Sequence, residues 1–213
     1  MSRNYLTEFI GTFFLTLTIG ATVITGTPFA PLAIGSSLMV MVYMGGHISG
    51  AHYNPAVTLA VYLRGKLAAR EVGPYMLSQL AGAIAASLVV YLLTGRSFAP
   101  DPNFDAVTKL GAVTGEFLFT FALALVVLNV ATATKTAGNS YFGLAIGFTV
   151  LVGAVAMGGL SGGAFNPAVG TGPAIVHALV GGGSLKDVWI YLVGPFLGGA
   201  AAAGVFKLQN PGD

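Results

Sequence analysis

Two short apolar stretches that open with the same four residues constrain this chain more than any other feature. Asn-Pro-Ala-Val occurs at 54–57 and again at 166–169, and it opens the apolar segments 55–63 and 167–180. Asparagine caps helices and proline suits the first helical position, so each motif predicts a helix start. At 1.5 Å per residue, each helix would cover roughly half of a hydrocarbon core about 30 Å thick. We therefore expect two half-helices inside a membrane.

The rest of the chain consists mostly of longer apolar segments. Of its 213 residues, 55% are hydrophobic and 8% are charged, and the mean hydropathy is +0.82, whereas a soluble domain has about 25% charged residues. A spanning helix needs about 20 apolar residues. The sequence predicts an all-α membrane protein in which two half-helices accompany six transmembrane helices at 5–24, 31–44, 72–94, 110–130, 141–157 and 187–206.

The two halves of the chain repeat each other. Glu8-Phe9 is echoed by Glu116-Phe117, and Ser-Gly precedes both Asn-Pro motifs at matched spacing. Each repeat, about 1–97 and 108–213, holds three spans and one half-helix. An odd number of spans inserts the second repeat upside down, so the two broken segments converge near the membrane midplane. We expect one channel domain over 1–213.

Charge and composition exclude several functions. Nine basic and seven acidic residues give a net charge of +2 with no clustered basic surface, so no nucleic acid partner is expected. The chain has no cysteine, and no set of residues predicts a metal site or a cofactor. No removable signal peptide is expected at the N-terminus. The positive-inside rule places both termini in the cytoplasm, because one side of the six-span arrangement holds Arg3, Arg64, Lys66, Arg70, Lys135 and Lys207, against Arg96, Lys109 and Lys186 on the other.

Asn54 and Asn166 are the central candidates for a transport site. If both half-helices start at the midplane, two positive dipole ends and two amide side chains face one small volume. A water oxygen there accepts hydrogen bonds from both amides, which turns its hydrogens outward and interrupts a proton wire. The paired dipoles also repel cations. This pattern predicts passage of uncharged molecules and exclusion of protons and metal ions.

The glycine-rich segments before the two motifs are expected to expose backbone carbonyls to the pore. Glycine permits the unusual dihedrals that such segments need, and free carbonyls offer acceptors to passing solutes. The predicted acceptors are Gly50, Ala51 and His52 in the first segment and Gly162, Gly163 and Ala164 in the second, with His52 lining the inner vestibule.

These residues resemble those of the aquaporin, or major intrinsic protein, family over essentially the whole chain. The resemblance rests on two Asn-Pro-Ala boxes, a Gly-His-Ile-Ser-Gly-Ala-His approach and a glutamate in helices one and four. It implies a six-helix bundle, a homotetramer with one pore per subunit, and passive conduction without a cofactor. It also implies that Glu8 and Glu116 brace the half-helix loops. The boxes comprise Asn54, Pro55, Ala56, Asn166, Pro167 and Ala168.

The chain departs from the family pattern at the outer constriction. Most members carry an arginine after the second box, where this chain has Val169. Matched by spacing, the other constriction positions are Ile34, Ala154 and Gly163, so the filter is expected to be wide and apolar. The pattern resembles plant vacuolar members with valine at this position, which implies water together with urea, peroxide or ammonia. Glycerol and CO2 stay open as alternatives.

Two other classes fit less well. A secondary transporter can share inverted repeats and broken helices, but it needs a coupling-ion site, and only Glu8 and Glu116 supply carboxylates within the spans. An enzyme would need a nucleophile, an acid–base pair or a metal set in the cavity. The sequence predicts a channel and not an enzyme.

Overall fold

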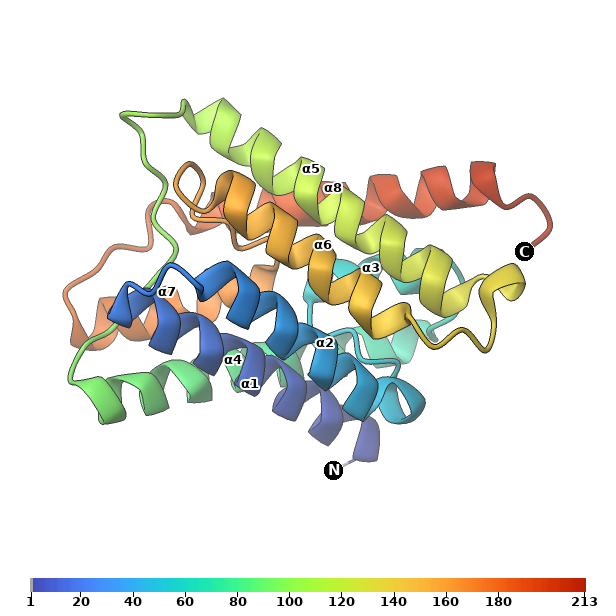
Figure 1. Ribbon diagram of the computed structural model, residues 1–213, viewed down its shortest axis with the longest axis horizontal. Helices are drawn as coiled ribbons and strands as arrows, with labels where there is room; N and C mark the ends of the chain where they lie inside the picture. The colour runs from blue at the N-terminus through green and yellow to red at the C-terminus, as the bar shows by residue number, and fades with distance from the viewer. Residues whose placement is uncertain (1) are drawn as a thin grey trace.

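The computed structural model describes residues 2–213 and is entirely helical in its regular structure over that range. Eight α-helices are joined by short connections, and a π-helix and a 3-10 turn follow the fifth (Figure 1). The α-helices are α1 (Arg3–Thr25), α2 (Ala30–Ser49), α3 (Pro55–Leu63), α4 (Ala69–Thr94), α5 (Lys109–Val127), α6 (Phe142–Met157), α7 (Pro167–Val180) and α8 (Val188–Gln209).

Both chain termini lie at the same end of the bundle, which we call the termini end, and the opposite end is the distal end (Figure 1). The long helices run between these ends. The half-helix α3 occupies the half of the bundle nearer the termini end, and α7 occupies the distal half (Figure 1). The expected pair of half-helices is therefore present, with the bounds that the sequence predicts.

The two repeats pack in the same way. Helix α1 lies against α4 as α5 lies against α8, while α2 and α6 pack against each other across the centre. Both repeat pairs need glycine, because a Cβ at Gly82 would lie 2.5 Å from Phe9 O and a Cβ at Gly198 would lie 2.5 Å from Phe117 O. Such small residues let membrane helices approach closely, where apolar lipid supplies no hydrophobic driving force between them.

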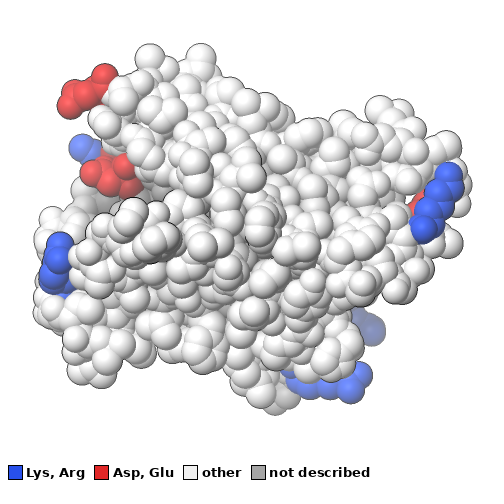
Figure 2. Space-filling model, viewed as in Figure 1, with Lys and Arg blue, Asp and Glu red and all other residues white. Residues whose placement is uncertain are grey.

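The outer surface is suited to lipid. Five helices are long and apolar enough to span a membrane, and α6, an apolar helix of 16 residues, crosses beside them as the sixth. Large apolar side chains such as Leu77, Leu92, Leu110 and Leu179 point outward. Charged residues gather at the two ends and leave a broad uncharged band between them (Figure 2). This is an integral membrane protein with six spans.

Two helix ends differ from the sequence prediction. The second span was expected to end at residue 44, but α2 continues to Ser49. Gly45 and Gly46 lie inside this helix and do not end it. A side chain at Gly45 would collide with the Tyr53 hydroxyl and with Thr7, so close packing requires glycine at that position. The fourth span gives way at Leu128–Thr132 to a π-helix.

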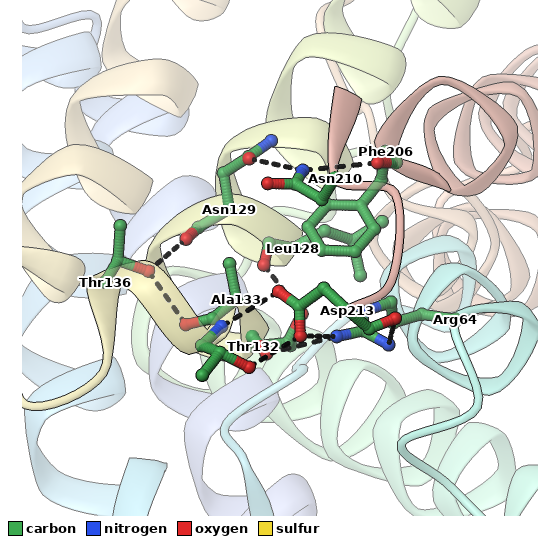
Figure 3. Close-up of polar contacts among 10 residues, drawn as sticks. Arg64, Leu128, Asn129, Thr132, Ala133, Thr136, Phe206, Asn210 and Asp213 are labelled. Atoms are coloured by element: carbon green, nitrogen blue, oxygen red, sulfur yellow. Dashed lines mark hydrogen bonds and ion pairs between the residues drawn. The ribbon is translucent and has the colours of Figure 1, made fainter. Parts of the chain in front are cut away.

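A polar cluster ties three segments together at the termini end (Figure 3). The Arg64 guanidinium donates to Asp213 Oδ1 at 2.8 Å and to Thr132 O at 3.4 Å, and it lies 4.6 Å from the centre of the Phe206 ring. The Asp213 carboxylate also accepts from the Thr134 hydroxyl and amide, at 2.7 and 2.9 Å. The end of α3, the α5–α6 connection and the C-terminal tail are thereby held together.

Candidate functional site

Each half-helix begins at a re-entrant loop that returns the chain to the middle of the bundle. Asn54 caps α3 by accepting a hydrogen bond from Ala56 N at 2.9 Å, and Asn166 caps α7 by accepting from Ala168 N at 2.9 Å. An asparagine side chain oxygen is well suited to the unpaired amides of a helix start. The cap fixes the orientation of each amide group.

The two asparagines also bind the opposite loop. Asn54 Nδ2 donates to Phe165 O at 2.8 Å, and Asn166 Nδ2 donates to Tyr53 O at 2.8 Å. Tyr53 and Phe165 both have a φ of 49°, a left-handed conformation that costs roughly 1–3 kcal/mol for a bulky residue. That strain turns their carbonyls toward the partner loop. Because each amide nitrogen carries two hydrogens and uses one here, each asparagine keeps one N–H donor.

Glu8, fully buried in α1, holds the first loop in this conformation. Its Oε1 accepts from Ser49 Oγ at 2.7 Å and from His52 N at 2.9 Å. Its Oε2 accepts from Tyr53 N at 2.6 Å and from Gln79 Nε2 at 2.9 Å. Four donors therefore meet one carboxylate, including the amide of the strained Tyr53.

Glu116, fully buried in α5, does the same for the second loop with fewer partners. Its Oε1 accepts from Ser161 Oγ at 2.7 Å and from Ala164 N at 3.1 Å. Its Oε2 accepts only from Phe165 N, at 2.6 Å. The geometry of both glutamates is that of a bracket for the loop backbone, as the family resemblance implies.

A further set of contacts occurs only in the first repeat. Thr58 Oγ1 donates to Asn54 O at 3.1 Å and accepts from Gln79 Nε2 at 2.8 Å. The Thr58 hydroxyl also lies 3.1 Å from His52 Nδ1, so a hydrogen bond joins the imidazole to this set of contacts.

The two loops line one continuous cavity of about 430 Å3. It extends from Val23 and Asp101 at the distal end, past both asparagines, to Val57 and Val127 on the side of the termini end. The wall contains all four predicted filter positions and most of the predicted loop positions: Ile34, His52, Asn54, Ala154, Gly162, Gly163, Ala164, Asn166 and Val169.

Two of the six predicted carbonyl acceptors lie off this wall, as do Pro55, Ala56, Pro167 and Ala168 of the two boxes. Gly50 is exposed and caps the end of α2 with a φ of 88°, and Ala51 is buried with its amide bound to Ser49 Oγ at 3.1 Å. Because α2 is one turn longer than expected, both residues are used in the reversal of the chain. The first loop contributes His52, Tyr53 and Asn54 to the cavity instead.

Sequence reasoning missed the connection between α4 and α5. Phe98, Ala99, Pro100 and Asp101 line the distal part of the cavity. An irregular segment has no periodic pattern to predict its position, but Phe98 was a usable signal, because a large apolar residue in a polar loop is commonly buried. Its side chain is only 8% exposed.

The cavity offers binding without catalytic groups. Within residues 2–213, no group of three His, Asp or Glu side chains is placed to hold a metal ion. The carboxylates of Glu8 and Glu116 are bound to backbone amide, hydroxyl and side-chain amide donors. What the cavity presents is a mainly apolar wall with two amide donors at its centre.

Comparison with known proteins connects this geometry to one family. The sequence profile described as Major intrinsic protein matches residues 1–206. Among plant relatives, aquaporin NIP1-3 of Oryza sativa subsp. japonica is 39% identical over 97% of this chain and 73% of its own length. Nodulin-26 of Glycine max is 36% identical over 97% of this chain and 77% of its own length.

A solved structure has the same fold. The aquaglyceroporin from Plasmodium falciparum aligns with a TM-score of 0.86 and 26% sequence identity, covering 96% of this chain and 95% of its own. The match extends over both repeats and both half-helices.

Proposed function

This chain belongs to the major intrinsic protein family of membrane channels, and from that premise we propose that it conducts water and small neutral solutes while excluding protons and cations. It is a channel and not an enzyme. The solutes, the proton barrier and the filter residues are the parts proposed for this chain.

One observation carries the proposal: the asparagine pair at the centre of the cavity. Each side chain is fixed by its helix cap and its bond to the opposite loop, which leaves one N–H per asparagine for a solute. A water whose oxygen accepts from both asparagines must turn its own hydrogens toward the two exits, so a proton cannot hop through. The N-termini of α3 and α7 add positive potential at the same point.

The filter residues support a solute range wider than water. Ile34, Ala154, Gly163 and Val169 lie on the cavity wall distal to the asparagines and bring no side-chain donor or charge. Without an arginine there, the wall leaves room for small neutral molecules such as urea, glycerol, hydrogen peroxide, ammonia and CO2, and backbone carbonyls offer acceptors to those that donate hydrogen bonds.

An inverted-repeat transporter would bind its coupling ion at a carboxylate. Glu8 and Glu116 already accept four and three hydrogen bonds from the protein. A carboxylate whose oxygens are bound to donors of the protein itself is a poor site for a coupling ion. Solute uptake into vesicles should therefore be insensitive to proton and sodium gradients.

Orientation and assembly follow the same premise. We propose that the termini end faces the cytoplasm, because six of the nine basic residues lie there.

We also propose a homotetramer with one pore per subunit. Light scattering of the detergent-solubilised protein measures the mass of the assembly, and a monomer would refute it.

The test of the proposed function is stopped-flow light scattering on liposomes after a hyperosmotic jump with urea or glycerol. Shrinkage reports water flux and reswelling reports solute flux. Fast shrinkage followed by fast reswelling is the expected result. Vesicles that shrink and reswell no faster than empty liposomes would overturn the proposal.

Val169→Arg tests the filter assignment. An arginine at this wall position narrows the passage and adds a charge, so solute flux should fall by about tenfold or more, with water less affected. Val169→Leu is the matched control for size without charge and should reduce solute flux by less. Unchanged urea and glycerol flux in the arginine variant would show that Val169 does not line the conducting path.

A further inference from the structure

The polar side chains on the cavity wall are unevenly placed. Of the wall residues within 2–213, five have polar side chains, and four of these belong to the re-entrant loops: His52, Tyr53, Asn54 and Asn166. The Tyr53 hydroxyl points away from the cavity and donates to Met41 O at 2.9 Å. The fifth is Asp101, in the connection between α4 and α5, which is the only acidic residue among the wall residues of the described chain.

The position of Asp101 is set by a loop that is packed down on the bundle. Phe98 is buried against α1, where a Cβ at Gly20 would collide with its ring. The backbone of Asp101 lies against the second re-entrant loop, since a Cβ at Gly162 would lie 3.0 Å from Asp101 N. Asn103 N donates to Leu160 O at 2.9 Å. The backbone of this loop is therefore held in place, and Asp101 lines both the cavity and the chamber outside it.

The Asp101 carboxylate is free to bind a solute. The three ion pairs found within residues 2–213 join Arg64 to Asp213, Arg70 to Glu71 and Lys186 to Asp187, and Asp101 is in none of them. Its side chain is exposed and makes no hydrogen bond with the described part of the chain.

The cations nearest to this mouth have other partners. Arg96 and Lys186 line an adjoining distal chamber of about 450 Å3, whose wall includes Asp101. Arg96 donates to Ile24 O at 3.1 Å, and Lys186 lies 3.9 Å from Asp187. The chamber also contains His177, whose Nδ1 lies 2.8 Å from Ser97 Oγ. Solutes reach Asp101 through a polar chamber and then meet an apolar filter.

We propose that Asp101 is a specificity residue that makes the distal entrance selective for solutes with two parallel N–H donors, urea and its close analogues being the class it fits. This inference rests on the proposed function. Carboxylates accept bidentate hydrogen bonds from two parallel N–H groups, and urea presents such a pair. Asp101 accepts hydrogen bonds from the solute at the point where the solute loses its water before it passes Ile34, Ala154 and Val169.

The distal wall lacks side-chain hydrogen-bond donors, and this strengthens the preference for solutes that donate hydrogen bonds. A filter arginine would supply donors, but here every side chain on the wall between Asp101 and the asparagines is apolar or glycine, and the carbonyls are acceptors. A solute that only accepts hydrogen bonds finds no side-chain partner until the asparagines.

The experiment compares urea and water permeability in the same liposomes for the wild type, Asp101→Ala and Asp101→Asn. Asp105→Asn is the matched control, because Asp105 lies on the same loop but off the cavity wall. We expect the urea-to-water permeability ratio to fall about three- to tenfold in Asp101→Ala, the range for losing a hydrogen bond to a charged group at a partly wet site. Asp101→Asn should fall less, and Asp105→Asn should keep the wild-type ratio.

The outcomes separate the two proposals. An unchanged ratio in Asp101→Ala, or an equal fall in Asp105→Asn, would overturn the role of Asp101. Wild-type protein that conducts water but no urea would overturn the urea preference and leave the channel function standing. Wild-type protein that conducts neither would overturn the proposed function itself. Should Asp101→Ala fail to insert, the ratio in Asp101→Asn decides.

Discussion

The re-entrant loop of the first repeat carries His52 and is followed by Thr58, whereas the loop of the second repeat has Ala164 and Gly170 at the matching positions. The frame around both loops is shared: Tyr75 donates to Ser49 O at 2.9 Å and Tyr191 donates to Ser161 O at 2.6 Å.

The helices that pack behind the loops also differ, and again the first repeat has the polar side chain. The first repeat has Gln79, which joins Glu8 to Thr58, and the second has Pro195 in its place, which offers no donor. The repeat fold fixes the asparagines, and the remaining positions are free to differ. Of the differing positions only His52 and Ala164 lie on the cavity wall, so the first loop brings an imidazole to the passage where the second brings a methyl group.

Replacing each glutamate by glutamine should break the two brackets unequally. In Glu8→Gln either amide orientation leaves one backbone amide unpaired, His52 N or Tyr53 N, and also forces the Ser49 hydroxyl or the Gln79 amide to reorient. Glu116→Gln can leave only Phe165 N unpaired, with no second partner to reorient. At about 1–3 kcal/mol per buried unpaired group, both variants should lose stability, and Glu8→Gln should lose more. Thermal unfolding in detergent measures both, and an equal loss would contradict the comparison.

Gln79→Met would give the first bracket the donor count of the second. It removes the bonds to Glu8 and Thr58 but also removes Gln79 Oε1, which is buried without a partner. The net loss should be small, about 1 kcal/mol, because these effects oppose each other. Thermal unfolding beside Glu8→Gln is the check. A loss as large as that of Glu8→Gln would show that Gln79 is essential to the bracket.

The smallest effect is expected at the termini end, where Arg64 of the first repeat meets Asp213 of the second. Hydrogen bonds from Thr134 lower the pKa of Asp213 below its ordinary value. A lowered pKa means that the contact is present at neutral pH and is lost as the pH falls through that value. The protection factors for amide hydrogen exchange at residues 133–139, which correct for the intrinsic pH dependence of exchange, should be high at neutral pH and should fall when the pH drops below the ordinary aspartate value of 3.8.

Asp213→Asn is the matched variant for this contact. It should show faster exchange at residues 133–139 already at neutral pH, and it should lose the pH dependence. The same protection in the variant and the wild type would mean that other contacts hold this connection.

Local signals in the sequence predicted much of the fold. The starts of α3 and α7 follow from Asn-Pro, because the cap and the first helical turn depend on adjacent residues. The spacing from Asn166 also placed Ala154, Gly163 and Val169, which now lie on one wall. Repetition of the motifs predicted the inverted arrangement.

Contacts between distant segments could not be predicted. The bonds from Asn54 to Phe165 and from Asn166 to Tyr53 need a left-handed residue before each asparagine, which no local preference of an aromatic residue favours. Asp101 reaches the cavity because its loop packs on the second repeat. These features depend on tertiary packing, which overrides local pattern.

The central claim is that the asparagine pair passes water and stops protons. The direct measurement is water and proton flux in the same liposomes, by light scattering and by an entrapped pH-sensitive dye, for the wild type and for Asn166→Asp. We predict fast water flux with proton flux at the level of empty liposomes in the wild type, and a proton leak in the variant, where a carboxylate opposes the dipoles of α3 and α7. Proton flux that rises together with water flux in the wild type would contradict the account.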